Sequence, residues 1–297
     1  MKSILTLTCL LVAQLSFAQL KSVVVDSTTG KKIAYVNIWV ENGNAGTTSD
    51  QQGAFELAIE KPQIIVFSAI GYETRSISSD SIKSTVTLTP AVIVLEQVEV
   101  VSKRKNKSLT IGEIRKSKVN HFFGCGGMPW VAARYFAYDE AYSNTPYLAK
   151  VRVLTNSDIQ DSRFKVRLYS VKENGGPGNY LYDKNIFGIA RKGKKFTDVD
   201  LTDLDIEFPE AGFFVAIEWL IIDENLHEYT YTNQGSNKRL TGTSFEPSIG
   251  TVWADTDDNS WVFIGGHWRK ALKNNFGDAG KRTKPYSLIA VELTLTN

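Results

Sequence analysis

The amino-acid sequence predicts an all-β protein built from two β-sandwiches. Apolar side chains recur at every second position through much of the chain, which is the period of a half-buried strand. The strand-like segments are short, and glycine-containing turns separate them. No segment carries the apolar period of a helix longer than a turn or two. We expect a small sandwich over residues 19–101 and a larger one, of jelly-roll type, over residues 124–297.

Composition limits the classes of function that the chain can have. It has 297 residues, of which 42% are hydrophobic, and 34 Lys and Arg stand against 32 Asp and Glu. This composition is typical of a globular protein, and the small net charge of +2 gives no sign of a nucleic-acid partner. The whole chain has three His and two Cys, which excludes zinc-finger arrays, haem attachment and disulfide-rich scaffolds.

The residues at the start of the chain, 1–18, have the order of a secretory signal peptide. Lys2 supplies a positive charge, residues 4–13 form an apolar run, and Ala18 precedes the expected cleavage point. The apolar run is shorter than the ~20 residues that a transmembrane helix needs, and no later segment is long and apolar enough to cross a membrane. We therefore expect an exported protein without a transmembrane segment after cleavage, in the periplasm, at the outer membrane or outside the cell.

The smaller domain is predicted from closely spaced strands. Within residues 33–40, two sets of side chains alternate and therefore face opposite sides of one strand. One set is Ala34, Val36, Ile38 and Val40, and the other is Tyr35, Asn37 and Trp39. Residues 64–69 are continuously apolar, as expected of a strand in a sandwich core. About seven strands in about 80 residues predict a small β-sandwich.

Three motifs follow one another in this segment. They are Val25-Asp26-x-x-x-Gly30-x-x-Ile33-x-Tyr35-Val36-Asn37-Ile38, then Gly46-Thr47-Thr48-Ser49-Asp50-x-x-Gly53-x-Phe55, then Phe67-Ser68-x-x-Gly71-Tyr72. With this ordered set of turn glycines, the segment resembles the carboxypeptidase D regulatory-like domain, a transthyretin-like sandwich of seven strands. The resemblance implies a structural and interaction module and not a catalytic one.

Similar domains extend the N-termini of many TonB-dependent transporters of the bacterial outer membrane, and this likeness implies the same compartment. Fewer than 200 residues follow Val101. A transporter barrel of 22 strands, at ~10 residues each with loops and a plug, needs more chain than this. We therefore do not expect a transporter.

A basic segment, residues 102–123, separates the two predicted domains. It contains Lys103, Arg104, Lys105 and Lys107. Weak helical spacing of its apolar residues allows a short helix. We interpret the segment as a solvated linker, with contact to an anionic lipid surface or an acidic partner as the alternative.

The larger domain is predicted over residues 124–297. Apolar and basic residues alternate over residues 164–168, which predicts a half-buried strand. Residues 213–222 are almost wholly apolar apart from Glu218, as expected of a central strand covered on both faces. The strand-like segments on either side of Gly193 suggest a hairpin.

The sequence contains no recognisable catalytic motif. A zinc carboxypeptidase needs a His, a Glu three residues later and a distant second His, and none of His121, His227 and His267 has a Glu at that spacing. Neither a Gly-x-Ser-x-Gly elbow nor a phosphate-binding glycine loop is present. Cys125 and His121 form a conceivable nucleophile pair, but a tight glycine turn explains Cys125 better. A glycosidase pair of carboxylates depends on spacing in three dimensions and stays open.

Two candidate sites lie toward the C-terminal end. The first is an oxygen-rich loop that offers ligands for calcium, formed by Asp255, Asp257, Asp258 and Asn259. The second is an aromatic cluster with the chemistry for stacking on a sugar, formed by Trp253, Trp261, His267 and Trp268. The structural alternatives are a polar turn for the first set and core packing for the second. Calcium is the one cofactor that these residues suggest.

These observations favour an exported, non-enzymatic binding protein of the bacterial cell envelope. In this interpretation the first domain docks, and the second binds a glycan or a protein partner. Two alternatives stay open. One is a glycoside-active enzyme with a carboxylate pair on the larger sandwich, and the other is a purely structural envelope component.

Overall fold

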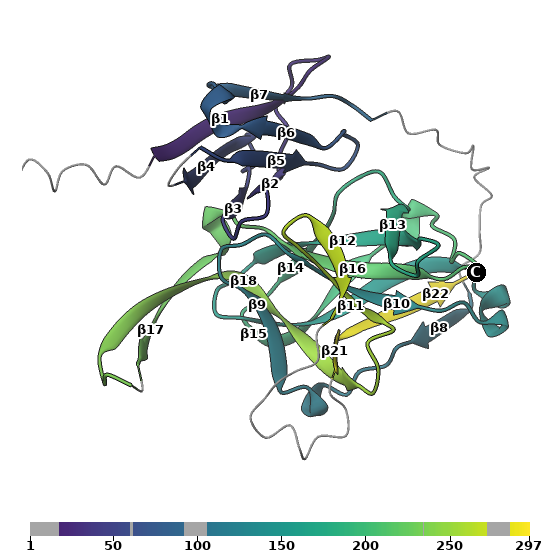
Figure 1. Cartoon of the computed structure of the whole chain (residues 1–297). Coiled ribbons are helices and arrows are strands. Elements are labelled where there is room, and N and C mark those ends of the chain that lie inside the picture. Colours follow the sequence, from purple (N-terminus) through teal and green to yellow (C-terminus); the bar gives the residue numbers. More distant parts are fainter. Residues whose placement is uncertain (1–17, 60–61, 92–105, 234, 272–285) are drawn as a thin grey trace, which may run out of the picture.

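The computed structural model describes residues 18–59, 62–91, 106–233, 235–271 and 286–297. Within these ranges the chain forms strands in four sheets, joined by turns and short 3₁₀ segments (Figure 1). The prediction of an all-β fold is confirmed. Most of the predicted signal peptide, the last ten residues of the predicted first domain (92–101) and the basic residues 103–105 lie outside the described residues.

Among the described residues, no helix combines the length and the apolar character that crossing a membrane requires.

The first domain is a sandwich of seven strands. They are β1 (Ala18–Asp26), β2 (Asn37–Val40), β3 (Gly46–Thr48), β4 (Ala54–Ile59), β5 (Ile64–Ser68), β6 (Arg75–Ser78) and β7 (Thr85–Leu88). One sheet has the order β4-β1-β7, with β1 and β7 parallel, and the other has the order β3-β2-β5-β6. Their apolar faces enclose a core that includes Val24, Ile38, Phe55 and Phe67. The predicted seven-stranded sandwich is confirmed.

Carboxylates fix two turns of this domain. Asp26 Oδ1 accepts hydrogen bonds from the backbone N–H groups of Thr28 and Thr29, both at 2.8 Å, and Asp26 Oδ2 accepts one from the Tyr72 hydroxyl at 3.0 Å. The bond from Thr29 is the largest of the effects that together lower the pKa of Asp26. Asp50 accepts hydrogen bonds from two backbone N–H groups of its own turn. The Tyr72 bond also ties the third sequence motif to the first.

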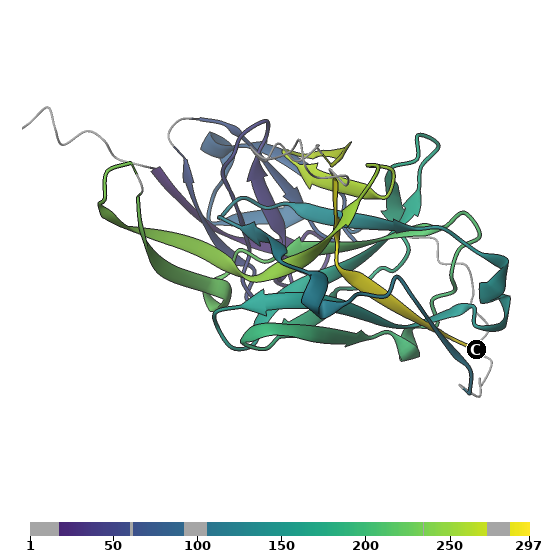
Figure 2. The same ribbon diagram turned by 90° about the horizontal axis from the view of Figure 1, so that it is seen from below.

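The second domain is a larger sandwich (Figures 1 and 2). Its strands are β8 (Ser108–Ile111), β9 (His121–Cys125), β10 (Val131–Phe136), β11 (Tyr147–Ser157), β12 (Ser162–Val171), β13 (Pro177–Tyr180), β14 (Ile186–Ala190), β15 (Gly193–Asp200), β16 (Phe213–Trp219), β17 (Leu226–Thr232), β18 (Arg239–Ala254), β19 (Ser260–Ile264), β20 (His267–Lys270), β21 (Tyr286–Ile289) and β22 (Val291–Thr296). One sheet has the order β13-β12-β16-β10-β19-β20, with β14 beside β12. The other has the order β17-β18-β11-β22-β8, with β15 beside β11 and both β9 and β21 beside β18.

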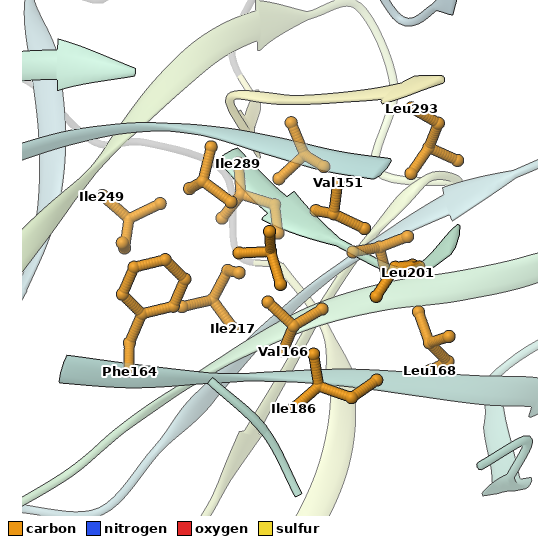
Figure 3. Packing of buried hydrophobic residues seen from close by; sticks show 14 of the residues in the cluster. Val151, Phe164, Val166, Leu168, Ile186, Leu201, Ile217, Ile249, Ile289 and Leu293 are labelled. Atoms are coloured by element: carbon orange, nitrogen blue, oxygen red, sulfur yellow. The ribbon is translucent and has the colours of Figure 1, made fainter. Parts of the chain in front are cut away.

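The two sheets of the second domain face each other across one apolar core (Figure 3). Phe164, Val166 and Leu168 project into it from β12, and Val151 and Leu293 project from the opposite sheet. Each fully buried side chain of this size stabilises the fold by about 1.5–3 kcal/mol. Hydrophobic burial therefore contributes strongly to the stability of this domain.

The second domain begins earlier than the predicted boundary at residue 124. Strand β8 pairs with β22, and Ile114 and Val119 are buried, so residues 108–123 are part of the sandwich and not a linker. The predicted short helix is a single 3₁₀ turn over Lys116–Lys118. The sequence did not indicate this boundary, because β8 is only four residues long and basic residues flank it.

The hairpin predicted around Gly193 is wrong. Strand β14 pairs with β12 in one sheet, and β15 pairs with β11 in the other, so the chain changes sheets at this turn. Gly193 has a φ of +90°, which a glycine adopts without steric cost. The glycine turn thus joins strands that belong to two different sheets and does not form a hairpin.

The first domain contacts the second through its β2–β3 side (Figure 1). The backbone N–H of Thr48 donates to the carbonyl oxygen of Ile221 at 3.3 Å, and the N–H of Ile221 donates to Thr48 Oγ1 at 3.1 Å. Tyr35 packs in an apolar cluster with Leu220 and Ile222. Backbone hydrogen bonds and apolar contacts therefore join the two domains.

The alternation in residues 33–40 determines which side chains reach this interface. Val36 and Ile38 are fully buried in the core of the first domain. On the opposite face, the Trp39 ring lies 6.0 Å from the ring of Phe263 in the second domain. One strand thus builds both the core and the docking surface.

Candidate binding cleft between the two domains

The outer face of β12 and β16 carries charged side chains that are buried. Lys165 and Arg167 on β12 and Glu218 on β16 alternate with core residues and so point away from the core. All three are at most 3% exposed. The prediction that residues 164–168 form a half-buried strand is therefore wrong, because both faces of β12 are covered there. The expectation that residues around Glu218 are covered on both faces is confirmed.

Glu218 connects the two cations. Its Oε1 accepts a hydrogen bond from Lys165 Nζ at 2.6 Å, and its Oε2 accepts one from Arg167 Nε at 3.0 Å. Lys165 Nζ also donates to the carbonyl oxygen of Tyr35 in the first domain at 2.6 Å. Buried charges are tolerated when they are paired and hydrogen-bonded. This network therefore takes one of its hydrogen-bond acceptors from the first domain.

Burial and pairing act in opposite directions on these groups. Burial would raise the pKa of Glu218, but Arg167 and Lys165 hold it at about 2. For Lys165, loss of water outweighs the attraction of Glu218 and lowers the pKa to about 8. Burial would lower the pKa of Arg167, but Glu218 raises it. At pH 7 all three groups are therefore predominantly ionised, and the network carries an excess of positive charge.

A cleft of about 740 Å³ lies beside this network, between the two domains. Its volume is within the range of small-molecule sites. Six aromatic side chains line it, two from the first domain and four from the second: Trp39, Tyr72, Tyr169, Tyr180, Phe263 and Trp268. The polar side chains that line it include Asn37, Asn179 and Glu218.

The aromatic rings form a wall that crosses the domain interface. The ring centre of Tyr169 lies 4.9 Å from that of Tyr180 and 5.2 Å from that of Trp268. Phe263 lies 5.4 Å from Trp268 and 6.0 Å from Trp39. Rings at these separations attract one another. The wall is complete only when the first domain is docked, because Trp39 belongs to that domain.

Two buried polar atoms near the cleft have no hydrogen-bond partner among the described residues. They are Asn37 Oδ1 and Arg167 Nη1. Asn37 lines the cleft, and Arg167 lies against Tyr180, with 5.5 Å between the guanidinium carbon and the ring centre. An unpartnered buried polar atom costs about 1–3 kcal/mol. A ligand that donates a hydrogen bond to Asn37 Oδ1 would remove part of this cost.

The aromatic cluster predicted from the sequence is divided between different parts of the domain. Trp268 on β20 lines the cleft, while Trp261 on β19 is buried at 8% exposure. His267 is exposed at the start of β20. Trp253 lies on β18 in the other sheet, with its ring 5.7 Å from that of His121. Closeness in sequence did not place the four side chains in one site, because the chain between them changes sheets.

Sequence reasoning missed Trp39, Tyr169 and Tyr180 as parts of a site. The alternation correctly placed Trp39 on the strand face opposite to that of Val36 and Ile38. Tyr169 continues the outward-facing series of β12 that begins with Lys165 and Arg167. This alternation was the available signal, but it could not show that the two outward faces meet.

A lysine forms ion pairs with two carboxylates of the oxygen-rich loop. Lys270 Nζ lies 3.4 Å from Asp257 Oδ1 and 3.1 Å from Asp258 Oδ1. The hydrogen bond from Lys270 is the main cause that lowers the pKa of Asp258. Calcium binding by this loop, which also contains Asp255 and Asn259, would have to displace the lysine, and it stays a prediction.

Cys125 has the surroundings of a structural thiol. It is 2% exposed, and its Sγ donates to the carbonyl oxygen of Met128 at 3.4 Å. Burial raises the pKa of the Cys125 thiol to about 11. Nucleophilic cysteines have a lowered pKa instead. The geometry thus supports the structural interpretation of Cys125.

Another hollow between the domains, of about 650 Å³, is acidic. Its lining includes four carboxylates: Asp50, Glu56, Asp223 and Glu224. Asp50 accepts backbone hydrogen bonds within its own turn, and Glu56 pairs with Lys21 at 2.5 Å. Two of the four carboxylates therefore already have local partners.

Comparisons with known proteins bear on the first domain. Residues 20–100 match the family model of the CarboxypepD_reg-like domain, which confirms the resemblance seen in the sequence. A search of curated proteins found no match.

Similar solved structures include two of the protein Cwp84. The first contains the cysteine protease and lectin-like domains of Cwp84, a surface layer associated protein of Clostridium difficile. It shares 13% identity over 57% of this chain and 32% of that one, with a TM-score of 0.34. The second is a variant of the clostridial cysteine protease Cwp84 after propeptide cleavage, with 11% identity over 89% of this chain and 65% of that one, and a TM-score of 0.41. The chain thus spans less than two thirds of either structure.

Proposed function

We propose that this chain is an exported, non-enzymatic binding protein of the bacterial cell envelope, and that the cleft between its domains holds the ligand. The aromatic wall that Trp39 completes from the first domain carries this proposal. A regulatory-like first domain supports a binding or regulatory role for the chain. The signal-peptide-like order of residues 1–18 supports export.

The chemistry of the cleft suits a carbohydrate. Sugar rings have apolar faces that stack on aromatic side chains, and Tyr180 keeps 40% of its surface exposed for such a contact. Sugar hydroxyls donate hydrogen bonds, and Asn37 Oδ1 is a buried acceptor without a partner among the described residues. We therefore favour an envelope glycan as the ligand over a protein partner.

The charges around the cleft favour binding over hydrolysis. Glu218 is the one carboxylate among the described residues that line the cleft, and Lys165 and Arg167 engage both of its oxygens. A glycosidase of the usual kind uses two carboxyl groups on either side of the scissile bond. A glycoside-active enzyme would have to use another surface, such as the acidic hollow.

A glycan array followed by a tryptophan-fluorescence titration tests the proposal. The protein should bind at least one oligosaccharide class, and Trp268→Ala should weaken that binding by about tenfold, since one stacking contact is lost. Trp253→Ala is the matched control, because Trp253 lies in the other sheet, and it should bind like the wild type. Silence across the array, or equal losses in both variants, would count against the proposal. Mass spectrometry of the incubated oligosaccharide separates binding from cleavage.

A further inference from the structure

Three side chains with metal-binding chemistry meet at the base of the β17–β18 hairpin. Asp158 directly follows β11, His227 lies on β17, and Glu246 lies on β18. One ligand atom from each residue lies within 4.8 Å of the other two. None of the three lines the interdomain cleft. They were not candidates from the sequence, because long stretches of chain separate them.

The hairpin itself extends away from the body of the sandwich (Figure 1). Its strands pair from Leu226 opposite Phe245 to Thr232 opposite Arg239. The three side chains lie at the base of this hairpin. On β18, Glu246 directly precedes Pro247. Any ion bound there would connect the hairpin to the turn that follows β11.

The distances fit a metal ion with little rearrangement. His227 Nδ1 lies 3.7 Å from both Asp158 Oδ2 and Glu246 Oε1. Ligand atoms held at about 2.0–2.2 Å from a tetrahedral zinc ion lie about 3.3–3.6 Å apart. The Asp158 side chain is 64% exposed and free to adjust, whereas that of Glu246 is 5% exposed. The ligand atoms of Asp158 and Glu246 lie within 4.8 Å of each other, so closing the site needs a modest movement, which the exposed Asp158 side chain can supply.

The charges also favour a cation. Among the described residues, neither Asp158 nor Glu246 has a Lys or Arg within ion-pair distance. Within the described part of the chain, the Glu246 carboxylate accepts hydrogen bonds from neutral donors only, Ser244 Oγ and the Ser248 N–H, both at 3.2 Å. Burial raises the pKa of Glu246, and the nearby charge of Asp158 adds to the effect. A buried carboxylate with no strong counter-charge gains from a bound cation.

We propose that Asp158, His227 and Glu246 bind a divalent transition-metal ion, with zinc as the favoured ion. Calcium takes six to eight oxygen ligands, whereas this set combines one imidazole nitrogen with two carboxylates. That donor set suits zinc and leaves one tetrahedral position for water or another ligand. The bound ion would fix the base of the hairpin to the sandwich.

Isothermal titration of zinc chloride into the chelator-treated, tag-free full chain tests this site. One zinc ion should bind per chain. Asp158→Asn and His227→Ala should each weaken binding by at least about tenfold, because each removes a ligand. Asp158 is exposed, so its variant should fold normally. His267→Ala removes an exposed histidine outside the group and should keep the wild-type affinity.

Cobalt(II) provides a second readout. The wild type should show the visible absorption bands of tetrahedral cobalt, and His227→Ala should lose them. If His227 contacts the two carboxylates without binding a metal ion, the titration will show no stoichiometric zinc binding. That result would overturn the proposal. Zinc binding that survives in both Asp158→Asn and His227→Ala, or calcium binding tighter than zinc, would overturn it as well.

Discussion

Lys165 of the second domain donates a hydrogen bond to the carbonyl oxygen of Tyr35 in the first, with 2.6 Å between nitrogen and oxygen. The same nitrogen lies 2.6 Å from Glu218 Oε1. Tyr35 has a φ of +59°, a conformation that is uncommon for residues other than glycine, and its ring packs edge-on against Phe187 at 5.2 Å. A backbone carbonyl of one domain is thus part of the charge network of the other, and docking and charge burial depend on each other.

Replacing Glu218 with Gln should lower the free energy of unfolding of the second domain by about 3–5 kcal/mol, because two buried cations lose their counter-charge. Urea unfolding followed by intrinsic tryptophan fluorescence, to which the buried Trp219 contributes, measures this loss. Asp198→Asn is the control, since it removes an exposed carboxylate that pairs with Arg152 at 2.7 Å. It should cost less than about 1 kcal/mol. Equal losses in the two variants would contradict the role of the buried network.

Acid should weaken the fold as Glu218 becomes protonated. The pKa of Glu218 is about 2 in the folded chain against an ordinary value of 4.5. The ionised group therefore stabilises the fold fully above about pH 4.5, and this stabilisation disappears as the pH falls to about 2. Calorimetric melting temperatures of the wild type and of Glu218→Gln should converge between these pH values. A constant gap between the two curves would be inconsistent with a depressed pKa.

The hydrogen bond between Thr48 and Ile221 should protect the domain interface. Thr48→Val keeps the shape of the side chain but removes the acceptor of the Ile221 N–H, which lies at 3.1 Å. An unpartnered buried N–H costs about 1–3 kcal/mol, so the Ile221 amide should exchange with deuterium about tenfold faster. Thr85→Val, on an exposed position of β7, is the control and should leave this amide unchanged. Equal exchange rates of the Ile221 amide in the wild type, Thr48→Val and Thr85→Val would show that this hydrogen bond does not limit local opening of the interface.

Cys125 should be unreactive in the folded protein. Its thiol is buried, and burial raises its pKa to about 11. In a Cys9→Ser chain, where Cys125 is the one remaining thiol, iodoacetamide at pH 8 should modify it only after unfolding. Mass spectrometry of native and denatured samples measures the difference. Rapid modification of the native sample would restore the nucleophile interpretation.

Much of the fold follows from local periodicity. The alternation in residues 33–40 correctly separated Val36 and Ile38, which lie in the core, from Trp39 on the opposite face. The same reasoning failed at Lys165, because the period of a strand shows which side chains share a face but not what covers that face. Here the covering element is a different domain.

The candidate sites were harder to predict for the same reason. Trp268 was a candidate, but its partner Trp39 lies in the other domain, and no sequence spacing links the two. Asp158, His227 and Glu246 come from a turn and two strands, so only the pairing of β17 with β18 brings two of them together. Contacts of this kind depend on tertiary packing, which a single sequence does not display.

The proposed binding role requires that both domains build one ligand site. The direct measurement is the affinity of Trp39→Ala for whichever oligosaccharide the wild type binds, determined by fluorescence titration beside Trp268→Ala and the control Trp253→Ala. We predict that the first two variants, one in each domain, both lose about tenfold in affinity while the control does not. Wild-type affinity in Trp39→Ala, with a loss in Trp268→Ala, would show that the second domain binds alone and would contradict the claim.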